Sequence, residues 1–135
     1  LDTSGSDITQ KFLYAKNVMD KAVSAGENSL VKIDSIILAN LSIGVVSKDG
    51  SNLEIGDYKS TNVELDFAVF NKKEEYSNPT FILKSISGNN LFLSGFVDSL
   101  ATIELPNDLR PSVKSSKEIE NLLYGVVYGV ATKKP

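Results

Sequence analysis

The pattern of residues 63–106 limits the fold of this chain more than any other feature. Residues 63–71 alternate apolar and polar side chains, which predicts a strand with one buried face. Two more apolar runs, 81–86 and 91–96, flank the Ser-Gly-Asn-Asn sequence at 87–90. Because Gly and Asn tolerate positive φ, this order predicts a β-hairpin. The stretch therefore predicts an antiparallel β core.

Residues 7–26 show a different period. Their apolar side chains recur at steps of three and four residues, with Asp7 placed as an N-cap and Gly26 as a C-cap. We expect an amphipathic N-terminal helix over 7–26 that packs on the β core. Residues 1–6, which are mostly small and polar, are expected to form a flexible leader.

The run from residue 31 to 43 predicts a long strand. It is apolar on one face, and Ile36 and Leu38 make the other face apolar midway. Such a strand is either covered on both faces or keeps one face for a partner. With 135 residues and one expected core, the chain is predicted to be a single domain, 7–135. Its expected fold is mainly β: an antiparallel, immunoglobulin- or fibronectin-like β-sandwich.

The C-terminal segment combines two signals. A capping-box sequence at residues 115–118 predicts a short helix over 116–122. The following residues favour a strand that either closes its own sheet or offers an edge for β-addition between subunits. The candidate interaction residues are those of this strand, together with the second apolar face of the long strand: Tyr124, Val126, Tyr128, Val130, Ile36 and Leu38.

Composition removes most catalytic chemistry. The chain has no Cys and no His, and it lacks the phosphate-binding and nucleophile-elbow motifs. Glu64 and Asp66 lie two residues apart on one predicted strand face, which leaves a small carboxylate-dependent enzyme as a third alternative. We expect a protein that is not an enzyme and that holds no metal or cofactor.

The charge balance argues against nucleic acid as a partner. The formal net charge is −3, and Arg110 is the single arginine among the 14 basic residues. Abundant Lys, Asn and Ile indicate an AT-rich, prokaryotic coding genome. No apolar run of about 18 residues is present, so any membrane contact is expected through a segment outside this chain. The polar start without Met indicates a processed or trimmed protein that is extracytoplasmic and tethered to the cell envelope.

Four segments follow one another in an order that resembles the WHy domains of late embryogenesis abundant type 2 proteins: 33–43, 63–71, 81–96 and 101–106. The shared features are a Gly-Asn turn and an Ile-x-Leu-Pro strand end at 103–106. The Asn-Pro-Asn-type motif of that family is broken here, because Asn78-Pro79 lies downstream of Asn71. The resemblance implies a fibronectin-like β-sandwich and a non-catalytic, stress-protective or membrane-associated role.

The chain is also similar in layout to archaellum or pilin-like subunits and to sandwich lipoproteins of secretion systems. In the former, a trimmed N-terminal helix, here with Thr9-Gln10-Lys11, leads into a β domain. The expected function is a non-catalytic interaction or assembly module of an envelope-anchored protein, such as a component of a cell-surface appendage or secretion machine. Its partner is expected to be a protein or a second copy. A WHy-type protective protein is the alternative.

Overall fold

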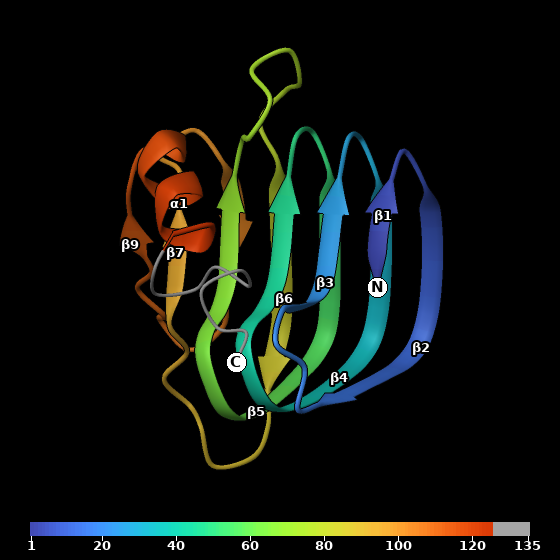
Figure 1. The fold of residues 1–135 in the computed structure, drawn as a ribbon. Helices are drawn as coiled ribbons and strands as arrows, with labels where there is room; N and C mark the ends of the chain where they lie inside the picture. The colour runs from blue at the N-terminus through green and yellow to red at the C-terminus, as the bar shows by residue number, and fades with distance from the viewer. Residues whose placement is uncertain (126–135) are drawn as a thin grey trace.

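The computed structural model describes residues 1–125, which wind into a parallel β-solenoid of about five turns (Figure 1). Every strand pairing in this part of the chain is parallel. The strands are β1 (Asp2–Ser4), β2 (Asp7–Lys16), β3 (Lys21–Gly26), β4 (Leu30–Lys48), β5 (Asn52–Phe70), β6 (Thr80–Ile86), β7 (Gly95–Val97), β8 (Thr102–Glu104) and β9 (Ser112–Val113). One helix, α1 (Ser116–Leu123), follows them.

Each coil contributes to two sides of the solenoid, and the long strands β4 and β5 run through both. The first side stacks β2, residues 30–39 and 52–61, β6 and β8. The second side stacks β1, β3, residues 41–48 and 63–70, β7 and β9. Leu30 pairs with Asn52 and Ile43 with Leu65, so one coil takes 22 residues. In Figure 1 the strands curve around the lower corner where the two sides meet.

Asparagines build this corner. Asn17, Asn40 and Asn62 all have φ between 54° and 58°, a left-handed conformation that Asn tolerates better than most residues. Their side chains form a ladder, in which Asn40 Nδ2 donates to Asn17 Oδ1 and Asn62 Nδ2 donates to Asn40 Oδ1, both at 2.9 Å. The ladder holds successive coils in register where the backbone turns.

Serines stack at the opposite corner. Ser6 N donates to Ser29 Oγ at 3.2 Å, and Ser29 N donates to Ser51 Oγ at 3.1 Å. Gly50, beside them, has a φ of 74°, and a Cβ there would lie 2.2 Å from the side-chain oxygen of Asn28. The positive φ therefore favours glycine at this turn, and any larger residue would also displace the Asn28 side chain.

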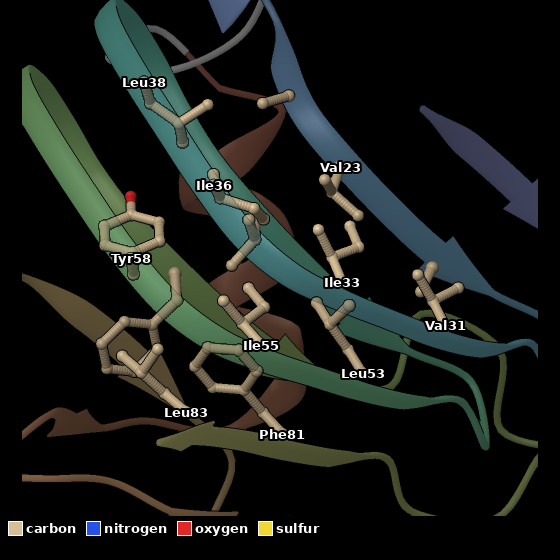
Figure 2. Packing of buried hydrophobic residues seen from close by; sticks show 14 of the residues in the cluster. Val23, Val31, Ile33, Ile36, Leu38, Leu53, Ile55, Tyr58, Phe81 and Leu83 are labelled. Carbon is tan, nitrogen blue, oxygen red and sulfur yellow. The ribbon is translucent and has the colours of Figure 1, made fainter. Parts of the chain in front are cut away.

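The interior between the two sides is a continuous apolar core (Figure 2). Burying each large aliphatic or aromatic side chain contributes about 1.5–3 kcal/mol. The most enclosed large side chains of this core are Ile33, Ile36, Leu38, Leu53, Ile55, Tyr58, Phe67, Phe81 and Leu83.

A second cluster lies on the outer face of the second side. Helix α1 contacts β5 and β7 and adds Ile119 and Leu123 to this cluster, so it covers the outer face of the second side at these two strands. The Ser115 side chain caps the helix by accepting from the backbone N–H of Glu118 at 3.1 Å. The short helix predicted over 116–122 is thus confirmed.

The predicted antiparallel, immunoglobulin-like β-sandwich is wrong. The expected hairpin strands do not pair with each other: β6 pairs with β5 and β8, whereas β7 pairs with β5 and β9. Alternation of apolar residues marks a strand with one buried face, but it does not tell whether the neighbouring strand is parallel or antiparallel.

The predicted helix over 7–26 is also wrong, because this segment forms β2 and β3. Two residues of its expected apolar stripe, Phe12 and Met19, are 54% and 44% exposed. The expected flexible leader contains β1, which pairs in parallel with β3.

Candidate functional site

Within residues 1–125, the coil that contains β1 and β2, here called the first coil, has a strand edge without a partner, here called the open edge. β2 pairs with β4 along one edge, and no strand of the described residues 1–125 pairs with its other edge. β1, in the same coil, pairs only with β3 within this part of the chain. In Figure 1 these strands lie at the right-hand end of the sheet. Such an edge is a template for pairing with another strand.

Hydrogen bonds at the ends of β2 show which backbone groups face the open edge. Ser6 O accepts from Leu30 N at 2.8 Å, and Asn17 N donates to Ala39 O at 3.0 Å. Alternate residues of a strand direct their backbone groups to opposite edges. Working inward from both ends, Asp7, Thr9, Tyr14 and Lys16 direct their N–H and C=O groups to the open edge.

The side chains of β2 make this edge partly apolar. Phe12 and Tyr14 point outward and are 54% and 56% exposed. Leu13 and Ala15 pack against the solenoid core from its open end. The buried Oε1 of Gln10 has no hydrogen-bond partner among the described residues. Charged residues at an edge commonly discourage aggregation, but exposed aromatic side chains beside an unpaired edge favour an interaction surface.

The asparagine corner borders a second feature, an open hollow of about 460 Å³. It is lined by Asn17, Val18, Met19, Asn40, Leu41, Ser42, Asn62 and Glu64. Two of the three corner amide groups already donate within the ladder. The hollow therefore combines the amide groups of the ladder with the apolar side chains of Val18, Met19 and Leu41.

The two carboxylates considered for catalysis do not share a surface. Glu64 is exposed, whereas Asp66 is 2% exposed and accepts hydrogen bonds from Tyr58 Oη at 2.9 Å and Ser94 N at 3.0 Å. Burial raises the pKa of Asp66, and burial together with the nearby Asp66 carboxylate raises the pKa of Tyr58. The hydrogen-bonded side chains of Asp66 and Tyr58 are thus part of the buried interior of the solenoid.

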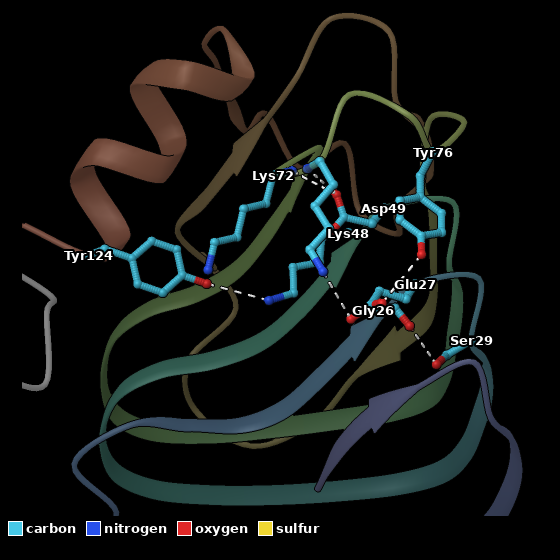
Figure 3. Close-up of polar contacts among 9 residues, drawn as sticks. Gly26, Glu27, Ser29, Lys48, Asp49, Lys72, Tyr76 and Tyr124 are labelled. Carbon is cyan, nitrogen blue, oxygen red and sulfur yellow. Dashed lines mark hydrogen bonds and ion pairs between the residues drawn. The ribbon is translucent and has the colours of Figure 1, made fainter.

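Tyr124 lies at the C-cap of α1 rather than on a strand (Figure 3). The Lys21 and Lys72 ammonium groups lie 4.8 and 4.4 Å from its ring centroid, and Lys48 Nζ donates to its hydroxyl at 3.4 Å. Cation–π contacts and the negative end of the helix dipole both favour lysines here. The cluster fastens the end of α1 to the second side.

The lysine cluster continues into a turn that supports the loop after β5 (Figure 3). The buried Asp49 carboxylate accepts from the backbone N–H groups of Lys72 and Lys73, both at 2.8 Å. Glu27 pairs with Lys73 at 3.3 Å and accepts from Tyr76 Oη, also at 3.3 Å. The hydrogen bond from Lys73 is the main cause of the lowered pKa of Glu27.

The structure does not bring the predicted interaction residues together. Ile36 and Leu38 are 0% and 1% exposed inside the core, so neither contributes to a surface (Figure 2). They point inward because the buried positions of β4 change phase between Ile33 and Ile36. Tyr124 is accessible, whereas Val126, Tyr128 and Val130 lie outside the described residues.

Sequence reasoning missed the open edge of β2 because the segment was interpreted as a helix. The signal that identifies it is a repeat: Ser29 and Ser51, like Asn40 and Asn62, are spaced by 22 residues. Such a period is typical of a solenoid.

Neither a family model, nor a curated protein, nor a solved structure matches this chain. Among residues 1–125, acidic side chains form no group of three that could hold a metal ion. Helix α1 is too short to cross a bilayer. No helix within residues 1–125 is both long enough and apolar enough to do so.

Proposed function

We propose that this protein is a non-catalytic interaction module that binds a β-strand at the open edge of its first coil. The observation that carries the proposal is the edge of the ten-residue strand β2 that no strand within residues 1–125 pairs with, beside the exposed rings of Phe12 and Tyr14. An added strand gains main-chain hydrogen bonds for affinity and side-chain contacts for specificity. The proposal keeps the expected setting, an envelope-anchored extracytoplasmic protein with a protein partner or a second copy.

The architecture suits this role. Strands of a solenoid are held by the neighbouring coil, so β2, already paired with β4, presents a preformed template at low ordering cost. β2 is paired with β4 at nine positions, from Asp7 to Lys16, which fixes its backbone before a partner arrives.

A labelled peptide with the sequence of residues 7–16 provides the test probe. Fluorescence anisotropy at low protein concentration should show saturable binding to the protein. The same peptide N-methylated at alternate residues should not bind, because methylation removes the edge hydrogen bonds.

A proline variant locates the binding edge. Thr9→Pro removes an N–H that faces the open edge and leaves the ladder to β4 intact, so it should abolish peptide binding while preserving the circular dichroism spectrum. Phe92→Lys, at a 90% exposed loop position, is the matched surface control and should bind normally. Equal binding of the methylated peptide, or no binding at all, would contradict the proposal and favour a protective protein that captures no strand.

A further inference from the structure

We infer that the partner of the open edge is a second copy of this chain, whose β2 pairs antiparallel with β2 about a two-fold axis between Lys11 and Phe12. The inference rests on the proposed function, since it names the strand that the edge receives. It predicts a closed, symmetric dimer of solenoids joined by their first coils.

The first argument is the exposure pattern of β2, which reads the same in both directions. Outward residues alternate with half-buried ones up to Lys11, the phase changes between Lys11 and Phe12, and the alternation then resumes. An antiparallel pairing centred on this point sets Asp7 opposite Lys16 and Thr9 opposite Tyr14. Every outward residue then faces an outward residue, and every inward residue faces an inward one.

Neighbouring registers fail this condition. A pairing shifted by two residues in one direction would oppose inward Gln10 to outward Lys11. A shift in the other direction would oppose outward Phe12 to inward Leu13. The phase change within β2 therefore selects a single register.

The backbone and the charges agree with the same register. The residues whose N–H and C=O groups face the open edge, Asp7, Thr9, Tyr14 and Lys16, oppose one another as hydrogen-bonded pairs. Asp7 of one copy opposes Lys16 of the second copy, and the symmetry repeats this ion pair at the other end of the strand. The two Phe12 rings flank the axis.

The other end of the described solenoid offers no comparable partner. Its terminal strands, β8 and β9, have three and two residues, against ten in β2. A head-to-tail stack would leave most of the β2 edge unpaired, whereas head-to-head pairing uses its whole length.

A charge-reversal cycle tests the register. Light scattering should give twice the 14.6 kDa chain mass for the wild type. Lys16→Asp places like charges opposite each other twice and should weaken dimerisation by roughly tenfold. Asp7→Lys combined with Lys16→Asp restores opposite charges and should recover the wild-type constant.

Disulfide trapping provides an independent readout, because the sequence contains no cysteine that could compete with the introduced ones. The double variant Thr9→Cys, Tyr14→Cys should form a covalent dimer under mild oxidation, since opposing Cα atoms of such a pair lie about 5.5 Å apart. The double variant Thr9→Cys, Lys16→Cys is shifted by two residues and should not.

The outcomes separate the two proposals. A dimer that is weakened by Lys16→Asp, restored by the double reversal and trapped only in register supports the inference. A monomer at the highest soluble concentration, a dimer indifferent to charge reversal, or preferential trapping of the shifted pair overturns it. If the monomer still binds the 7–16 peptide, the proposed function stands without self-association; if it binds no strand, both proposals fall.

Discussion

The two sides of the solenoid solve the same packing problem differently. On the first side, residues 30–39 and 52–61 bury one face in the core and leave the other to solvent. On the second side, most of residues 41–48 and 63–70 are buried on both faces, and the outer cluster joins their outward side chains to Ile119 and Leu123 of α1. Each long strand thus has one buried face on the first side and two buried faces on the second, and its sequence is more apolar where both faces are buried.

The largest expected effect on stability comes from replacing isoleucines of β4, three of which test this comparison. Ile33 faces the core, Ile43 belongs to the outer cluster that includes Ile119 and Leu123 of α1, and Ile37 faces outward on the first side; the first two are both 0% exposed. Replacing Ile33 or Ile43 by alanine should lower the free energy of unfolding by about 2–5 kcal/mol. Ile37→Ala should cost less than about 1 kcal/mol. Urea unfolding measures all three, and a small effect at Ile43 would show that the outer cluster stabilises the fold less than the core does.

The next test loosens the helix itself. The Asp98 carboxylate accepts from Ser116 N at 2.8 Å and from Ser116 Oγ at 2.7 Å, which holds the start of α1. Asp98→Ala should cost about 1–3 kcal/mol and speed hydrogen exchange in α1 while leaving β2 and β4 protected. The control Asp34→Ala removes an exposed carboxylate from the first side and should change neither quantity.

The pH dependence should separate Asp98 from Asp66, since their shifts have opposite signs. Although burial opposes it, hydrogen bonding from Ser116 and Leu100 leaves the pKa of Asp98 lowered, so its contribution is present above the unfolded value of about 3.9 and lost as pH falls through the folded pKa.

The pKa of Asp66 is raised by burial, so its contribution to stability is lost as pH rises from the unfolded value through the folded one. Asp66→Asn should remove this loss, and Asp98→Asn should remove the acid-side loss. Chemical unfolding between pH 3 and pH 7 measures both. An unchanged pH profile in either variant would contradict the corresponding assignment.

The smallest expected effect concerns the lysine cluster. Lys72→Met removes a cation from the Tyr124 ring and should cost about 0.5–1 kcal/mol, seen as faster exchange at the end of α1. Lys84→Met, at an exposed lysine of the first side, is its matched control. Equal effects of the two variants would mean that the cluster does not hold the helix.

Much of the local structure could be predicted from sequence. Residues 31–43, 63–70 and 81–86 are strands, and the Ser115 cap marks the start of α1. Strand direction could not be predicted, because a half-buried strand shows the same alternation in parallel and antiparallel sheets.

The N-terminal segment failed for a local reason. The inward positions of β2 change phase between Lys11 and Phe12, and the steps of three and four residues join side chains of both faces: Ile8 and Ala15 are half-buried, whereas Phe12 is exposed. The 22-residue spacing of Asn and Ser would have corrected the interpretation. The candidate site could not be predicted either, because the open edge belongs to a strand that was interpreted as a helix. Ile36 and Leu38 were assigned to the wrong face because the buried positions of β4 also change phase.

The longer turn after β5 shows where the chain can accept additional residues. Thr80 pairs with Asn52 across 28 residues of chain instead of 22, yet Thr80 then pairs with Thr102 at the ordinary spacing. The additional residues leave the stack as a projecting loop at the top of Figure 1 without disturbing the rungs on either side. The turn after β5 is thus a place where a foreign peptide can be grafted while the sides keep their length.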